Sequence, residues 1–124
     1  MLLQSEFYTI KTFTVEEQYE IKATININPE HRIFEGHFPA QPVVPGVCMI
    51  QIIKELAEQH LSSSLLMKSA SQVKFLQLLV PEHNQDIQVQ ISIKKEEEIS
   101  LIASLLQSGK AIMKINGRFA TAAH

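Results

Sequence analysis

Two stretches near the start of the chain have the hydrophobic pattern of β-strands. Residues 7–15 are rich in β-branched and aromatic side chains, and residues 19–28 alternate apolar with polar side chains. A period of two places the apolar side chains on one face of a strand. We therefore expect both stretches to be strands with one buried face.

The pattern changes in the middle of the chain. Residues 30–46 contain three prolines and two glycines, which favours an irregular loop. Residues 47–61 begin almost wholly apolar and then carry polar residues three and four apart. This pattern predicts a helix that is buried at its start and emerges towards solvent near its end. The serines at 62–64 are expected to end it.

The second half of the chain again has strand patterns, with Ser108-Gly109-Lys110 as a hairpin turn. The predicted strands cover residues 71–77, 86–94, 99–106 and 111–120. One helix among five or six mostly antiparallel strands predicts an α+β fold. A sheet wrapped around that helix would explain why its first half is apolar. We expect residues 1–124 to form a single domain.

Composition narrows the classes of function. The chain has 124 residues, of which 45% are hydrophobic, and a formal net charge of −2. This charge argues against nucleic-acid binding, and no apolar stretch approaches the roughly 20 residues that span a bilayer. A lone cysteine, Cys48, excludes an internal disulfide and is expected in the core. With no signal peptide visible, we expect a cytoplasmic protein. The histidines His31, His60, His83 and His124 lack the spacing of a metal site.

Candidate chemistry is concentrated in residues 34–47. His37 lies in a loop that prolines make rigid, and the following helix opens at Gly46. Backbone N–H groups of Gly46, Val47 and Cys48 are expected to face outward, where the helix dipole is positive. A histidine base beside such donors is what proton abstraction next to a thioester carbonyl requires. A lone loop histidine is more often structural, so the pattern alone leaves both interpretations open.

Two segments of the chain carry a family resemblance. Gly36-His37-Phe38-Pro39 with the following Pro42-Val43-Val44-Pro45-Gly46-Val47 closely resembles the active-site motif of FabZ and FabA type dehydratases. Val73-Lys74-Phe75, followed by Val80-Pro81 and a strand from Asp86, is similar to the family's next segment. The resemblance covers nearly the whole chain. It implies a hot-dog fold, in which an antiparallel sheet wraps one central helix.

The resemblance also implies an activity in fatty-acid or related lipid biosynthesis. Such enzymes are lyases that remove water from a 3-hydroxyacyl thioester on acyl carrier protein, giving the trans-2-enoyl thioester. His37 matches the catalytic histidine that moves the proton at C2, and Gly46 matches the glycine whose N–H polarises the carbonyl. The acyl thioester is expected to contact Phe38, Pro39, Val44, Pro45 and Val47.

The resemblance further implies how the protein assembles. Family members are dimers or trimers of dimers with active sites at subunit interfaces. They use no metal or redox cofactor, and the acyl chain arrives on the phosphopantetheine arm of acyl carrier protein. Because acyl carrier proteins are acidic, cations are candidates for docking. These candidates are Arg32, Lys54, Lys68, Lys74 and Arg118.

The chain departs from the family pattern at one position. The family's catalytic carboxylic acid lies fourteen positions after the histidine, where this chain has Gln51. An amide can bind the C3 hydroxyl but cannot give it a proton. Glu55, one helical turn further on, is a candidate acid in contact with substrate, although it could equally be a solvated or salt-bridged residue beside Lys54 and Glu58.

Two further explanations for Gln51 stay open. A related subunit that carries the missing carboxylate could complete a shared site in a heteromer. Alternatively, the chain could be a hot-dog thioesterase or a non-catalytic protein that binds acyl thioesters.

Overall fold

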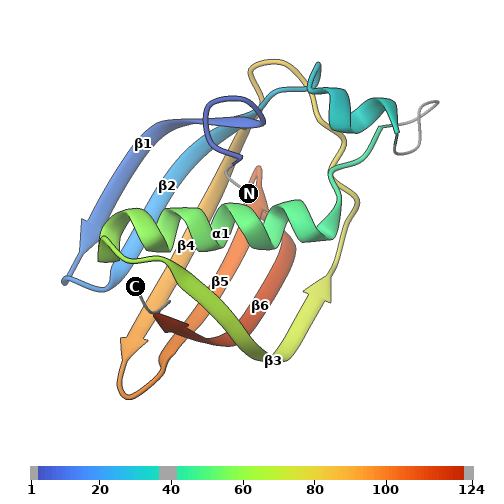
Figure 1. Ribbon diagram of the computed structural model, residues 1–124. Coiled ribbons are helices and arrows are strands. Elements are labelled where there is room, and N and C mark those ends of the chain that lie inside the picture. Colours follow the sequence, from blue (N-terminus) through green and yellow to red (C-terminus); the bar gives the residue numbers. More distant parts are fainter. Residues whose placement is uncertain (1–2, 37–41, 122–124) are drawn as a thin grey trace.

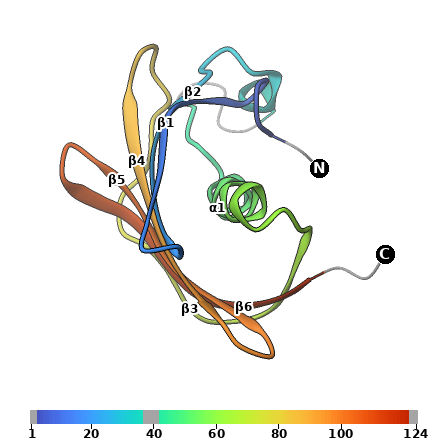
Figure 2. The same ribbon diagram turned by 90° about the vertical axis from the view of Figure 1, so that its left-hand side faces the viewer.

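The computed structural model describes residues 3–36 and 42–121 of the chain. One helix lies against a curved sheet of six strands, which wraps around it (Figures 1 and 2). The elements are β1 (Tyr8–Glu16), β2 (Glu20–Ile27), a 3-10 helix (Arg32–Glu35), α1 (Gly46–Leu61), β3 (Leu65–Phe75), β4 (Asp86–Lys95), β5 (Ile99–Gln107) and β6 (Lys110–Thr121). The predicted α+β arrangement is confirmed.

All neighbouring strands pair antiparallel, in the order β1-β2-β4-β5-β6-β3. The alternating pattern of the sequence sets which face of each strand packs against α1. Along β2, β4 and β5 every second side chain is buried, and the side chains between them are partly or fully exposed. The buried positions of β4, for example, are Ile87, Val89, Ile91 and Ile93. These inner faces form one core with the apolar stripe of the helix.

The strand β3 begins at Leu65, six residues before the predicted start. Only Leu65 is buried in this strand, which lies at the edge of the sheet and pairs with β6 alone. Register shifts interrupt the pairing between Met67 and Ser69 and between Ala70 and Gln72. An exposed, irregular edge strand has no alternating pattern to recognise.

The predicted loop at residues 30–46 is not wholly irregular, since it contains the 3-10 helix. His31 caps this short helix, because its Nδ1 accepts a hydrogen bond of 3.1 Å from the Ile33 N–H. Phe34 is buried and its ring lies 5.6 Å from that of Phe7. The cap and the aromatic contact together explain local order that the sequence pattern did not predict.

The burial of α1 agrees with the prediction near its end, where residues 58–61 are partly or fully exposed, and differs from it at its start. Val47 in its first turn is 74% exposed, whereas Leu56 and Ala57 in its third turn are fully buried. Val47 lies off the apolar stripe that starts at Cys48 and continues at helical spacing. The helix ends as predicted at Ser62, which adopts a left-handed conformation. Within the described residues, no helix is long and apolar enough to cross a membrane.

Candidate active site

The start of α1 is fixed from both sides. Val43 and Val44 are buried, and the Val44 N–H donates a hydrogen bond of 2.8 Å to the Leu79 carbonyl oxygen. Pro45 has an extended backbone and is the N-cap, without a side-chain cap. Gly46 is the first helical residue. The residues before α1 are therefore held against the segment that follows β3, which fixes where the helix begins.

The backbone donors at this point are fewer than the sequence suggested. The N–H groups of Cys48 and Met49 both donate to the Pro45 carbonyl oxygen, at 3.0 and 3.3 Å. The prediction that Cys48 presents a free N–H to a ligand is therefore wrong, because its donor is used inside the first turn. Gly46 and Val47 remain the candidate donors at the positive end of the helix dipole.

Packing gives a structural reason for glycine at position 46. A Cβ atom there would lie 2.6 Å from Cζ and 2.9 Å from Cε1 of Phe75, at the end of β3. Carbon atoms pack at about 3.5–4.0 Å, so a larger residue would push the ring away. The glycine allows an aromatic side chain to lie on the helix backbone. Because Phe75 is 53% exposed, the ring forms part of the surface around the helix start.

Gln51 lies on α1 in a half-buried position. Its Nε2 donates a hydrogen bond of 2.8 Å to Oε2 of Glu55, one turn further along. Oε2 also accepts a hydrogen bond from the Leu3 N–H, so it acts as an acceptor, and the amide directs its nitrogen, and not its oxygen, at Glu55. The side chain that the sequence resemblance aligns with the family acid thus donates a hydrogen bond to a neighbouring carboxyl group.

Glu55 is a buried carboxylate at 4% exposure, so the expectation of a solvated residue is wrong. It has three partners besides Gln51. The Leu3 N–H donates to Oε2 at 2.7 Å, and the Gln4 N–H and the Tyr8 hydroxyl donate to Oε1, both at 3.0 Å. The salt bridge expected as the alternative is also not found, since no cation of residues 3–36 and 42–121 pairs with Glu55. Two of its four partners are backbone N–H groups, which can only donate, so both oxygens of Glu55 act as acceptors.

Burial favours the neutral forms of two side chains in the core. Burial, followed by the charges of Glu55 and Glu58, raises the pKa of Tyr8, which keeps its hydroxyl a donor. Burial also raises the pKa of the Cys48 thiol, which agrees with a core role for this residue. Sequence reasoning missed Tyr8, because nothing in the pattern of β1 connects it to a helix residue 47 positions away.

The remaining candidate residues are dispersed or lie outside the described part. His37, Phe38 and Pro39 lie outside the described residues, so the pairing of His37 with Gln51 stays a prediction. Of the candidate docking cations, Lys68 and Lys74 lie on β3 and Arg118 on β6, while Arg32 and Lys54 lie on the 3-10 helix and α1. In the described ranges, no group of three or more His, Cys, Asp or Glu is arranged to hold a metal ion.

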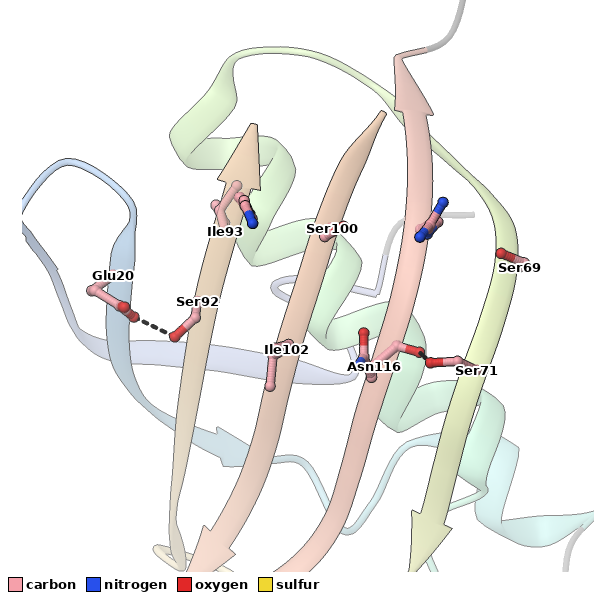
Figure 3. A pocket seen from close by; sticks show the side chains of 10 residues that line it. Glu20, Ser69, Ser71, Ser92, Ile93, Ser100, Ile102 and Asn116 are labelled. Carbon is pink, nitrogen blue, oxygen red and sulfur yellow. Dashed lines mark hydrogen bonds between the residues drawn. The ribbon is translucent and has the colours of Figure 1, made fainter. Parts of the chain in front are cut away.

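A polar hollow of about 520 Å³ lies on the face of the sheet opposite to α1 (Figure 3). Small side chains form much of its lining, among them Ser69, Ser71, Ser92, Ser100 and Asn116. The Ser92 hydroxyl donates to Glu20, and the Ser71 hydroxyl donates to the Asn116 carbonyl oxygen at 3.3 Å. None of the predicted catalytic or substrate-binding residues is among the described residues that line it, so this hollow is separate from the candidate site.

Comparison with known proteins places these features in a family context. Residues 13–114 match a family model described as ApeI-like, ApeI dehydratase. The 3-hydroxyacyl-[acyl-carrier-protein] dehydratase FabZ of Clostridium acetobutylicum is 28% identical over 105 residues, which cover 79% of this chain and 69% of that protein. FabZ of Pediococcus pentosaceus is 26% identical over 102 residues, covering 77% of this chain and 68% of that protein.

Solved structures agree on the fold. The dehydratase heterocomplex ApeI:P from Xenorhabdus doucetiae has a chain with a TM-score of 0.74 at 22% identity, covering 90% of this chain and 96% of that one. A hypothetical thioesterase with coenzyme A from Streptococcus pneumoniae has a TM-score of 0.65 at 8% identity, covering 99% and 94%. The predicted hot-dog fold is confirmed by these likenesses.

Proposed function

The chain belongs to the ApeI-like dehydratase family, and from this premise we propose that it is a 3-hydroxyacyl-[acyl carrier protein] dehydratase subunit. It would remove water from a 3-hydroxyacyl thioester and give the trans-2-enoyl thioester. The observation that carries this proposal is the start of α1. There Gly46 opens the helix beneath Phe75, and Gln51, which the sequence resemblance aligns with the family acid, donates a hydrogen bond to Glu55.

The proposed chemistry divides among three groups. His37 accepts the proton from C2 of the acyl chain, and the C–H electron pair becomes the new C2–C3 double bond. The Gly46 N–H donates to the thioester carbonyl oxygen, where negative charge develops. The C3–O bond breaks, and the departing oxygen needs one proton to leave as water. Gln51 binds this hydroxyl but has no proton to give.

We propose that a related subunit supplies the missing acid in a heteromeric dehydratase. Two observations support this assembly. The structural relative from Xenorhabdus doucetiae is described as a dehydratase heterocomplex. In addition, β3 has an edge that no described strand covers, and its exposed apolar side chains suit a protein interface. These side chains are Leu66, Met67, Val73 and Phe75.

Turnover of a 3-hydroxyacyl carrier-protein substrate tests the proposal. The purified chain would be assayed alone and together with a carboxylate-bearing homologue from the same organism, following formation of the enoyl thioester. We expect enoyl product in the mixture, lost when His37→Ala replaces the wild type and kept with the exposed-histidine control His83→Ala. Absence of product in both assays, or full activity of His37→Ala, would contradict the dehydratase assignment.

A thioesterase is the second candidate, because one structural relative is a hypothetical thioesterase with coenzyme A. The same incubations would therefore be examined for free thiol. Dehydration forms no free thiol, whereas hydrolysis releases one thiol per acyl chain. Thiol release without enoyl product would replace the dehydratase assignment by hydrolysis.

A further inference from the structure

We infer that the exposed edge of β3 selects a related subunit whose edge strand is acidic, and that the lysines of β3 oppose pairing with a second copy of this chain. The inference rests on the proposed function, because it takes the heteromeric assembly as its premise. It adds what that assembly alone does not give, namely the charge of the partner's strand and the reason why two identical chains pair poorly.

The two edges of the sheet are β1 and β3, and they differ in what they expose (Figure 1). On β1, all of which lies in the described ranges, Val15 is the one exposed large apolar residue, beside threonines, Lys11 and Glu16. Polar and charged side chains suit an edge that faces water, whereas clustered apolar ones mark a contact with another protein. The edge that a partner covers is therefore β3, which exposes Leu66, Met67, Val73 and Phe75.

Positive charge accompanies the apolar side chains of β3. Lys68 and Lys74 are both exposed, and the strand contains no aspartate or glutamate. Lys74 also lies opposite the exposed Lys114 of β6 in the register of the sheet. No carboxylate of residues 3–36 and 42–121 forms an ion pair with any of these three lysines. Because like charges opposite each other destabilise a sheet, a carboxylate from another chain would relieve this repulsion.

The spacing of the two β3 lysines makes self-pairing unfavourable. In a two-fold symmetric, antiparallel pair of identical strands, positions at equal distances from the centre lie opposite each other. Lys68 and Lys74 are each three residues from Ser71, so a pair centred on Ser71 sets Lys68 of each copy against Lys74 of the other. A pair centred on Ala70 makes them diagonal neighbours about 7–8 Å apart, within reach of long side chains. In both arrangements the repulsion occurs twice.

An acidic partner strand reverses the sign of these contacts. Carboxylates opposite Lys68 and Lys74 turn two repulsions into two attractions, and the apolar side chains of β3 stay available for packing. Repulsion of the wrong partner together with attraction of the right one gives an interface its specificity. Acyl carrier protein is another acidic candidate for these lysines. The uncovered backbone edge and the apolar side chains around them favour a strand of a related subunit.

Charge reversal within this chain tests the inference. The double variant Lys68→Glu with Lys74→Glu repels its own copies but attracts the wild type. Sedimentation equilibrium of the equimolar mixture should give a Kd about tenfold lower than that of either protein alone. The single variant Lys74→Glu should associate with itself more tightly than the wild type, because each copy then sets a carboxylate against Lys68 of the other. Equal Kd values for the mixture and for the wild type alone would overturn the inference.

A matched control separates the β3 edge from net charge. Lys95→Glu with Lys110→Glu changes the net charge by the same amount, at two exposed positions of β4 and β6. Its mixture with the wild type should associate no more tightly than the wild type alone. Tightening equal to that of the β3 variant would show that overall charge, and not the β3 edge, controls association, and would also overturn the inference.

Binding of the carboxylate-bearing homologue from the same organism extends the test to the expected partner. The β3 double variant should bind this homologue about tenfold more weakly than the wild type, and the control should bind it like the wild type. Weaker binding of acyl carrier protein, with unchanged binding of the homologue, would assign the lysines to carrier docking and overturn the inference.

The two proposals fail in different ways. If wild type and homologue pair in the charge-dependent manner but form no enoyl product, the proposed activity fails and the partner selection by β3 stands. If enoyl product forms, and the β3 double variant supports it equally well at limiting subunit concentration, the partner selection fails and the proposed function stands.

Discussion

Replacing Gln51 by glutamate should restore the acid that dehydration needs, but with an unusual pH dependence. Glutamate has nearly the shape of glutamine, so the introduced carboxyl would take the place of an amide nitrogen 2.8 Å from Oε2 of Glu55. Two carboxylates so close cannot both be ionised without strong repulsion. Leu3, Gln4 and Tyr8 all donate to Glu55 and favour the charge there. When the two carboxyl groups together hold one proton, we therefore expect it on the introduced glutamate.

The size of this effect follows from the separation of the charges. Two unit charges about 4 Å apart repel by about 4 kcal/mol at an effective dielectric constant of about 20. That energy corresponds to about a thousandfold in the proton-binding equilibrium. It raises the pKa of the introduced carboxyl well above the ordinary value of glutamate, towards neutrality. Because Gln51 is half-buried, screening by water makes this an upper bound.

The raised pKa of the introduced carboxyl decides how both the activity and the stability of the variant change with pH. A general acid works when protonated and contributes about 10²–10⁴-fold in rate. The gain in activity should therefore be largest on the acidic side of the raised pKa and should fall as pH rises through it. Stability should follow the same direction, since a folded-state pKa above the unfolded value lowers the free energy of unfolding as pH rises. The loss should reach at most about 4 kcal/mol.

Initial rates of enoyl formation across pH, for the chain assayed alone, measure the prediction. The matched control is Gln51→Glu combined with Glu55→Gln, which keeps the new acid and removes the neighbouring charge. Its activity should fall at a lower pH than that of Gln51→Glu, because the repulsion is gone. Identical pH profiles for the two variants would refute the charge argument, and no gain over wild type in either would refute the missing-acid argument.

Three further predictions concern stability. Gly46→Ala should lower the free energy of unfolding in urea by about 1 kcal/mol, because its Cβ meets the half-exposed Phe75 ring, and Phe75→Ala should relieve the loss. Tyr8→Phe should lower the free energy of unfolding in urea by about 1.5–3 kcal/mol, because it deletes the hydrogen bond to Glu55. A loss below about 0.5 kcal/mol would count against that bond. The pKa of Asp86 is lowered, mainly by a hydrogen bond from Asn26. Ionised Asp86 therefore stabilises the fold above the ordinary aspartate pKa, and this stabilisation is lost as pH falls through the lowered value. Thermal unfolding of Asp86→Asn should lack this part of the acid dependence.

The sequence predicted the elements whose burial differs between faces. The strand β4 alternates cleanly because one face packs against α1 and the other faces out, and it was predicted to within one residue of its end at Lys95. The start of β3 was missed for the opposite reason. From Leu66 to Phe75 the strand is exposed on both faces, so its residues carry no period. The alternation of apolar and polar residues reflects burial of one face of a strand, and after Leu65 neither face of β3 is buried.

For the candidate site, the motif located the helix start but not its surroundings. The position of Gly46 at the opening of α1 could be predicted, because glycine and proline mark that boundary. The contact of Gly46 with Phe75, the use of the Cys48 N–H and the partners of Glu55 could not. These contacts join residues far apart in sequence, or depend on the geometry of a single turn. Local spacing therefore left Glu55 open between a candidate acid and a residue of the helix surface, and did not predict its buried contacts.

Gln51 and Glu55 are better understood as one feature than as two. If Glu55 were solvated, glutamine at position 51 would simply be the loss of an acid. Because Glu55 is buried and both of its oxygens already accept hydrogen bonds, a carboxylate at position 51 would bring another acceptor oxygen against Oε2, whereas an amide donates a hydrogen bond there at 2.8 Å. Glu55 thus favours an amide at position 51, which the sequence resemblance aligns with the family acid. In the proposed reaction, Gln51 would therefore hold the 3-hydroxyl group, while the proton for the leaving water would come from another group.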